Sequence, residues 1–292
     1  MRLAAAVLVA TALAIPAAAH AKPTPRPKLA RWQTLTPPTA TMPEPTSTGS
    51  VEHDGASLYY ATFGDAKNPA VVLLHGGMGN SDHWVLQLPA LSDKHYVIAI
   101  DSRGHGRSTR PKKSKPTYDQ MADDVIAVLD SLQIAHAAFI GWSDGGEIAL
   151  KIAIQHPERV AKLFVFGANY DSNGSKPRGG RPSETFTAYA AKCRADYAKL
   201  STTPKAFDEL VQWLLPVWRS PMGFTKDQLR AIQAPTLVAD GDHDEVIVLD
   251  QIEEMSKLIP HAQLAVFPDT SHCALWQDPA DFTQTLLDFL AK

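Results

Sequence analysis

The first feature that could do chemistry is a serine between two glycines, Gly141-x-Ser143-x-Gly145. An apolar, strand-like run at residues 137–140 precedes it, and a run of helical composition at residues 147–154 follows it. A serine on a sharp turn between a strand and a helix is the arrangement of a nucleophile elbow, where glycines give the turn room. This pattern therefore predicts that Ser143 is a nucleophile.

A histidine and several aspartates that could assist this serine follow later in the chain. His272 comes after the last predicted strand, at residues 263–267. A histidine beside a serine can take the proton of its hydroxyl. Asp240, Asp242 and Asp244 all follow or end the strand before it, and a carboxylate there would orient the imidazole and stabilise its charged form. The residue types alone leave all three aspartates as candidates.

The elements that must position these residues alternate between strands and helices. Buried strands are predicted at residues 70–74, 96–101 and 160–167, and an amphipathic helix at residues 118–132. This alternation predicts a mainly parallel sheet with helices on both faces and an active site at the carboxyl ends of the strands. Two strand-like runs joined at Asp54-Gly55 precede them and predict a hairpin.

A glycine-rich loop, His75-Gly76-Gly77-Met78-Gly79, directly follows the first of these buried strands. Because glycine has no side chain, the backbone N–H groups of such a loop can face a ligand at close range. The alternative interpretation is a tight strand-to-helix turn without a ligand.

Residues 171–222, approximately, interrupt the alternation. Lys, Arg and Gly are frequent at residues 173–181, and the remainder has helical composition with many aromatic residues. We interpret this segment as a helical cap inserted over the strand ends. Its aromatic residues either line a substrate pocket or pack the cap onto the sheet.

The N-terminal residues divide into two segments before the folded domain. Residues 1–21 have a basic start, a short apolar core and the ending Ala19-His20-Ala21, which is typical of a secretory signal peptide. Residues 22–49 are rich in proline and threonine and predict a disordered linker. Residues 50–292 have the size of one α/β domain. We expect a mature protein that is exported to the periplasm or secreted.

The overall composition excludes several classes of function. A formal net charge of −3 without a basic cluster indicates neither a nucleic-acid partner nor an anionic membrane surface. No run after the signal peptide is long and apolar enough for stable membrane insertion. Cys193 and Cys273 have no metal-ligand spacing around them; in an exported chain they either pair as a disulfide or stay free. The sequence carries no indication of oligomeric state.

Taken together, the motifs resemble the α/β-hydrolase superfamily along nearly all of residues 51–292. Within it, the elbow Gly-Trp-Ser-Asp-Gly-Gly and the strand end at residues 166–169 resemble the biphenyl hydrolase-like group, which includes valacyclovir hydrolase, a serine esterase acting on amino acid esters. The glycine-rich loop is also similar to that of proline iminopeptidases, although Met78 stands where those usually have proline. The motifs that carry the resemblance are, in chain order, residues 75–79, 101–108, 141–146, 241–244 and 271–272.

The resemblance implies a role for particular residues. The family spacing Gly-x-x-Asp selects Asp244 as the acid of a triad with Ser143 and His272. The backbone N–H groups of Gly77 and Asp144 are expected to form the oxyanion hole. Asp144, Trp142 and Met78 are expected to contact the substrate. Such a triad requires neither a metal ion nor another cofactor.

The function that follows is a serine hydrolase that cleaves carboxylic esters through an acyl-enzyme. Asp144, beside the nucleophile, either attracts the amine of an amino acid ester or only hydrogen-bonds within the elbow. An aminopeptidase, amidase or lactonase could use the same triad, and a ligand-binding protein could retain the pocket without catalysis. A dehalogenase or epoxide hydrolase is disfavoured because those relatives have aspartate at the elbow.

Overall fold

The computed structural model describes residues 29–177, 182–219 and 223–292. Over these residues, eight strands form one sheet in the order β1-β2-β4-β3-β5-β6-β7-β8. β1 pairs antiparallel with β2, and β2 antiparallel with β4, whereas every later pair is parallel. The strands are β1 (Ser47–His53), β2 (Ala56–Phe63), β3 (Ala70–Leu74), β4 (Tyr96–Ile100), β5 (Ala137–Trp142), β6 (Val160–Phe166), β7 (Thr236–Gly241) and β8 (Ala262–Phe267).

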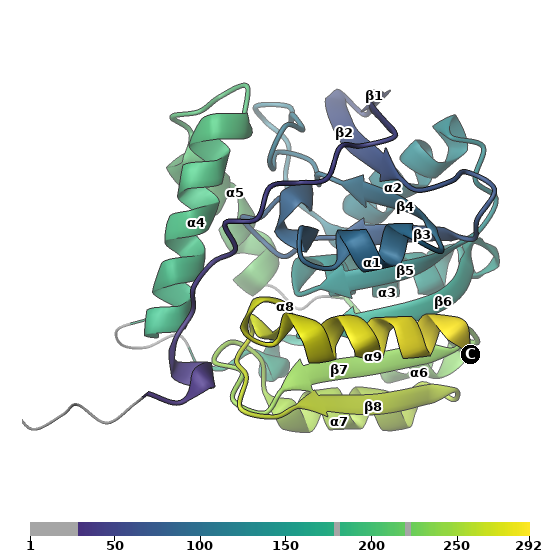
Figure 1. Ribbon diagram of the computed structural model, residues 1–292, viewed down its shortest axis with the longest axis vertical. Helices are drawn as coiled ribbons and strands as arrows, with labels where there is room; N and C mark the ends of the chain where they lie inside the picture. The colour runs from purple at the N-terminus through teal and green to yellow at the C-terminus, as the bar shows by residue number, and fades with distance from the viewer. Residues whose placement is uncertain (1–28, 178–181, 220–222) are drawn as a thin grey trace, which may run out of the picture.

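Helices cover both faces of this sheet (Figure 1). α1 and α9 lie on one face, and α2, α3, α6 and α7 lie on the other. Their bounds are α1 (Leu88–Ser92), α2 (Tyr118–Ser131), α3 (Asp144–Gln155), α6 (Lys226–Ala231), α7 (Leu249–Leu258), α8 (Ala274–Gln277) and α9 (Pro279–Ala291). The described residues also form four short 3-10 helices, η1 (Arg31–Gln33), η2 (Ser81–Trp84), η3 (Pro157–Arg159) and η4 (Ser172–Gly174). None of the helices in the described ranges has the length and apolar character needed to cross a membrane.

The central strands are apolar because both of their faces are covered. Every residue of β5 is buried, as are the last four of β3. On the α9 side, the ring of Phe282 packs against those of Phe164, Phe166 and Phe267 at centroid distances of 5.0 to 5.6 Å. Such two-sided burial leaves the carboxyl ends of the strands and their loops as the place where polar side chains can gather.

The insertion between β6 and β7 contains helices α4 (Glu184–Leu200) and α5 (Phe207–Arg219). Figure 1 shows both beside the carboxyl ends of the parallel strands, where the sequence predicts a cap. The buried stripe of α4 consists of Thr185, Tyr189, Cys193 and Tyr197, because residues four apart in a helix share one face.

Cys193 in α4 and Cys273 before α8 are both buried free thiols. Burial is the main cause that raises the pKa of each thiol, so both remain protonated at neutral pH. The disulfide that the sequence left open is absent between them. The cap is therefore joined to the sheet by packing and hydrogen bonds over the described residues.

The segment before β1 differs from the expected disordered linker. Residues 29–46 are mostly extended, as their prolines require, but they lie against the domain. Arg31 bonds the loop after β8, and Gln277 donates to the carbonyl of Thr34 at 2.9 Å. These polar contacts, together with two apolar side chains that pack on the core, hold the segment to the domain. The predicted signal peptide, residues 1–21, lies outside the described residues.

Candidate active site

Ser143 lies at the sharp turn between β5 and α3. Its backbone has φ 54° and ψ −123°, a left-handed conformation that side-chain-bearing residues seldom adopt. The Ser143 N–H donates to the Phe166 carbonyl at 2.8 Å, and the Ser143 carbonyl accepts from the Gly146 N–H at 2.7 Å. Such strain persists where the surroundings enforce it, and here the turn presents Ser143 to a cavity.

Two glycines make this turn possible. A Cβ at Gly141 would lie 2.2 Å from the carbonyl oxygen of Gly145. A Cβ at Gly145 would lie 2.2 Å from the carbonyl oxygen of Leu74 in β3. Both obstacles are backbone atoms, which cannot rotate away as a side chain can. The glycine spacing recognised in the sequence therefore follows from the close approach of β3, β5 and α3.

His272 lies in the loop after β8, and its imidazole pairs with the carboxylate of Asp244. His272 Nδ1 and Asp244 Oδ2 are 2.5 Å apart, and both side chains are buried. The second carboxylate oxygen, Oδ1, accepts from the N–H groups of Val246 and Ile247 at 2.5 and 2.7 Å. Because the carboxylate accepts, Nδ1 carries the proton and Nε2 is left as the basic nitrogen of the ring.

The surroundings of this pair favour the charged imidazole. Burial alone would lower the pKa of His272, but the charge and hydrogen bond of Asp244 raise it above its ordinary value, with help from Glu245 and Asp144. Burial alone would raise the pKa of Asp244, but His272 and the backbone donors lower it. Asp244 is therefore a carboxylate at neutral pH, able to stabilise His272 when it takes a proton.

The two rival aspartates have other partners. Asp242 accepts from the Thr270 N–H at 3.1 Å and lies 2.7 Å from the Nδ1 of His243. Asp240 is fully buried, and its burial and the charge of Asp244 raise its pKa. Asp240 is thus the neutral member of that carboxyl pair. The geometry separates Asp244, which contacts the imidazole, from the other two aspartates.

Trp142 differs from the expectation of a substrate contact. Its ring is fully buried, and it packs edge-on against the rings of Tyr189 and Trp276. Its indole N–H donates to the carbonyl of His272 at 2.9 Å. Because side chains alternate along a strand, the last residue of β5 turns away from the cavity. Trp142 instead fixes the backbone that carries His272.

The glycine-rich loop after β3 is held from within by His75. The Nε2 of this buried ring accepts from the Ser102 N–H at 3.0 Å, and Nδ1 donates to the carbonyl of Gly76 at 2.8 Å. Burial is the largest influence on the pKa of His75 and lowers it to about 4. The ring is therefore neutral at neutral pH, which matches one donor and one acceptor nitrogen.

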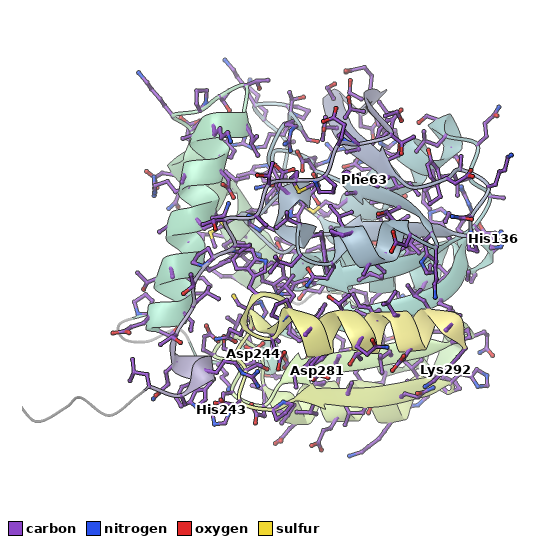
Figure 2. All side chains as sticks on the ribbon, in the orientation of Figure 1. Phe63, His136, His243, Asp244, Asp281 and Lys292 are labelled. Atoms are coloured by element: carbon purple, nitrogen blue, oxygen red, sulfur yellow. The ribbon has the colours of Figure 1, made fainter. Side chains whose placement is uncertain are left out.

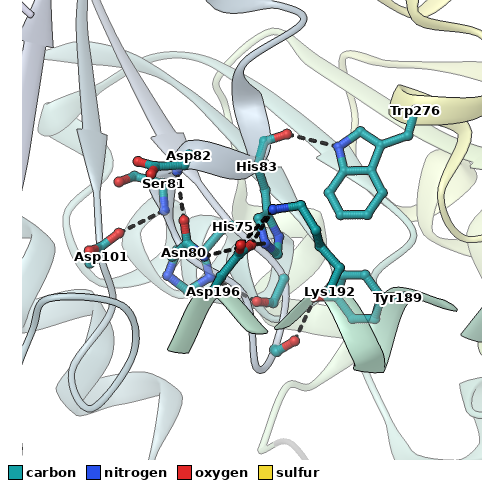
Figure 3. Close-up of polar contacts among 12 residues, drawn as sticks. His75, Asn80, Ser81, Asp82, His83, Asp101, Tyr189, Lys192, Asp196 and Trp276 are labelled. Carbon is teal, nitrogen blue, oxygen red and sulfur yellow. Dashed lines mark hydrogen bonds and ion pairs between the residues drawn. The ribbon is translucent and has the colours of Figure 1, made fainter. Parts of the chain in front are cut away.

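The cap helix α4 also contacts this loop (Figure 3). The Tyr189 hydroxyl donates to the carbonyl of Gly77 at 2.6 Å. The Asp196 carboxylate accepts from the Asn80 amide at 3.5 Å and lies 3.1 Å from the Nε2 of His83. The loop is thereby bound on one side by the sheet and on the other by the cap.

The two residues expected to form an oxyanion hole are neighbours in space. A Cβ at Gly77 would lie 2.7 Å from the Oδ2 of Asp144. Asp144 is the first residue of α3. The N–H groups of the first turn of a helix have no partner within the helix and can donate to a negatively charged group. Met78, which has φ 65°, lines the cavity beside them. This corner can therefore receive an oxyanion from a substrate bound at Ser143.

One cavity of about 640 Å³ joins these groups, and Ser143, His272, Gly77, Met78 and Asp144 all line it. The cap contributes apolar and aromatic lining through Phe186, Tyr189, Val211 and Trp218. Its size and mixed lining fit a small-molecule ligand. Across the described ranges, no group of three or more histidine, cysteine or acidic side chains is placed to hold a metal ion.

The cavity also contains charged residues that the sequence patterns did not single out, namely Glu147, Lys176 and Glu245. Glu147 follows Ser143 by four residues. Because residues four apart share one face of a helix, this spacing could have indicated that Glu147 lies on the same side as Ser143. Glu245 follows the triad acid directly, and its carboxylate accepts from the His272 N–H at 3.1 Å. No pattern in the sequence points to Lys176, which comes from the irregular segment before the cap helices.

Comparisons with known proteins can now be set beside this geometry. The chain matches the family described as alpha/beta hydrolase fold over residues 69–193 and 166–279. This chain belongs to the α/β-hydrolase family. The superfamily resemblance and the fold class indicated by the sequence motifs are thus confirmed.

Relatives and solved structures refine the placement of this α/β hydrolase. It is 30% identical over 245 residues to 2-hydroxymuconate semialdehyde hydrolase of Pseudomonas sp. (strain CF600), covering 76% of this chain and 87% of that protein. It is 26% identical over 262 residues to the serine hydrolase BPHL of Mus musculus, covering 87% and 89%. The fold superposes with a TM-score of 0.73 on a meta-cleavage product hydrolase from Pseudomonas fluorescens IP01, at 24% identity and covering 83% and 97%.

Proposed function

We propose that this α/β hydrolase cleaves carboxylic esters through an acyl-enzyme, with Ser143, His272 and Asp244 as its triad. The observation that carries the proposal is that His272, whose Nδ1 lies 2.5 Å from Asp244, lines the same cavity as a serine on a strained elbow. A serine hydroxyl becomes a usable nucleophile at neutral pH when such a base takes its proton.

The reaction then proceeds in two steps, acylation of Ser143 and hydrolysis of the acyl-enzyme. The Ser143 oxygen bonds the acyl carbon while its proton moves to Nε2 of His272, and the resulting oxyanion accepts from the N–H groups of Gly77 and Asp144. The carbon–oxygen bond to the leaving alcohol breaks, and His272 gives its proton to that alcohol. In the second step water attacks the acyl carbon while His272 takes its proton. The bond between the acyl carbon and the Ser143 oxygen then breaks, His272 returns the proton to that oxygen, and the acid is released.

Trapping the acyl-enzyme tests this proposal. Rapid mixing with p-nitrophenyl acetate is expected to release a burst of nitrophenol close to one equivalent, because the acyl group stays on the enzyme until water removes it. Mass spectrometry should then place one acetyl group on Ser143. Absence of turnover and acylation across ester, amide and lactone substrates would instead support a protein that only binds its ligand.

The finer proposal is that the acyl group carries an amine. Asp144, Glu147 and Glu245 bring three carboxyl groups to the cavity lining. Asp144 accepts hydrogen bonds from the indole of Trp218 at 2.9 and 3.0 Å and from the hydroxyl of Tyr118 at 3.1 Å. An ammonium group bound at this edge of the cavity would add charge attraction to a carboxylate that neutral donors already orient.

Asp144→Asn separates the amine from the rest of the substrate. A valine ester and the matching 3-methylbutanoate ester differ by the amine alone. The variant is expected to lower kcat/KM for the valine ester about 10- to 100-fold, the usual range for a hydrogen bond to a charged group. The amine-free ester should change less than about threefold, since only the side chain and not the N–H of residue 144 is altered. An equal loss on both esters would limit Asp144 to a role within the elbow.

A further inference from the structure

A short segment near the start of the described chain touches both loops that carry the proposed base and acid. This segment, residues 29–34, contains η1 and is termed the N-terminal clip here. It lies well before residue 69, where the family match begins. Figure 1 shows it next to the loops at the carboxyl ends of β7 and β8, and Figure 2 labels His243 and Asp244, which follow β7, on the same side of the molecule.

The clip binds the loop that leads to His272. The Arg31 guanidinium donates to the carbonyls of Pro268 and Asp269 at 2.8 and 3.2 Å, and it forms an ion pair with Asp278. The Arg31 N–H donates to the carboxylate of Asp269 at 3.3 Å. Asp269 has φ 53°, a conformation that persists where neighbouring contacts enforce it. Arg31 supplies part of those contacts.

Gln277 connects the clip to Ser271, the residue before His272. Its amide NH2 donates to the carbonyls of Arg31 and Thr34 at 3.0 and 2.9 Å. Its carbonyl oxygen accepts from the N–H of Ser271 at 2.7 Å. One side chain therefore joins the clip to the backbone next to the base.

The clip meets the acid loop through an aromatic stack. The Trp32 indole lies on the imidazole of His243 with ring centroids 4.6 Å apart and an interplanar angle of 14°. His243 directly precedes Asp244, and its N–H donates to the Thr270 carbonyl in the base loop at 2.9 Å. Trp32 thus packs on the point where the two loops are joined.

We propose that Arg31 and Trp32 are positioning residues, which hold the loops of His272 and Asp244 at the separation that their hydrogen bond requires. The inference rests on the proposed function of that pair. Arg31 and Asp269 are 37% and 49% exposed, and such exposed ion pairs contribute little to stability. Their effect is expected in the geometry of the site, where small displacements of a catalytic group have large effects on rate.

Point variants in the full chain test the clip. Arg31→Gln and Trp32→Ala are expected to lower kcat for a chromogenic ester about 5- to 20-fold while KM changes less than about twofold, because substrate contacts stay in place. Trp32→Phe keeps a stacking ring and should recover most of the loss. Arg230→Gln is the matched control, since Arg230 forms an exposed ion pair with Asp227 on α6.

The pH profile distinguishes positioning from general loosening of the fold. Asp244, Glu245 and Asp144 are the charged groups that raise the pKa of His272. A looser pair should therefore shift the acid limb of kcat/KM to lower pH, while the thermal midpoint stays close to that of the wild type. Wild-type kcat and pH profile in both variants, or a loss of activity that follows a fall in midpoint, would overturn the inference.

A substrate-free measurement keeps this test independent of the proposed reaction. The proton on His272 Nδ1, shared with Asp244 at 2.5 Å, should give a far-downfield resonance in the NMR spectrum of the wild type. Arg31→Gln should broaden or lose that resonance as the pair loosens. An unchanged resonance overturns the proposed positioning role of the clip. A wild-type protein that cleaves no ester contradicts the proposed function alone.

Discussion

Replacing Ser143 with alanine is expected to lower kcat for ester hydrolysis about 10⁴- to 10⁶-fold. The hydroxyl is the atom that bonds the acyl carbon, and no neighbouring group takes its place in the proposed mechanism. The residual rate comes from substrate binding and the oxyanion corner at Gly77 and Asp144. The burst of leaving group should disappear together with turnover.

Stability should be nearly unaffected by this change. Alanine experiences the same positive φ of 54° as serine, and the backbone hydrogen bonds of the elbow remain. We expect the free energy of unfolding to change by less than about 0.5 kcal/mol, measured by urea denaturation. Ser256→Ala removes a comparable hydroxyl in α7, which donates to the Glu253 carbonyl, and should leave kcat unchanged. A Ser143→Ala enzyme with more than about one tenth of wild-type kcat contradicts the nucleophile assignment.

Asp244→Asn is expected to lower kcat about 10³- to 10⁴-fold with little change in KM. Oδ1 of Asp244 accepts from the N–H groups of Val246 and Ile247, so the amide oxygen of asparagine must take that place. Its NH2 group then faces Nδ1 of His272. The imidazole must turn Nδ1 into an acceptor, which places the proton on Nε2 and removes the base that Ser143 needs.

The pH dependence of this variant has a defined sign. In the wild type, kcat/KM falls as pH drops through the pKa of His272, because the base must be neutral, and Asp244 raises that pKa. Asparagine carries no charge, so the acid limb should move to lower pH in Asp244→Asn. Asp242→Asn, whose carboxylate bonds Thr270 and His243 instead, should lower kcat less than about tenfold. A larger effect at Asp242 than at Asp244 would reverse the assignment of the acid.

The sequence by itself determined the features that depend on local patterns. The apolar pattern predicted β3 at residues 70–74 and α2 at residues 118–132, because a buried strand or helix face needs a regular spacing of apolar side chains. The glycines around Ser143 indicated the elbow, since two backbone segments approach within a distance that no Cβ allows. The chain order of serine, aspartate and histidine indicated the family that the comparison shows.

The tertiary structure decided what depends on the direction of side chains and on contacts between distant segments. Three aspartates within five residues are alike as residue types; the family spacing favoured Asp244, and the turn after β7 brings its carboxylate to His272. Trp142 stands beside the nucleophile, yet the alternation along β5 sends its ring into the core. The sequence predicted that residues 29–34 belong to a linker, because their contacts are made with residues more than 200 positions away. These contacts join Arg31 to the loop after β8 and Trp32 to His243. Such partners leave no periodic trace in the sequence, because each is a single pairing made by the completed fold.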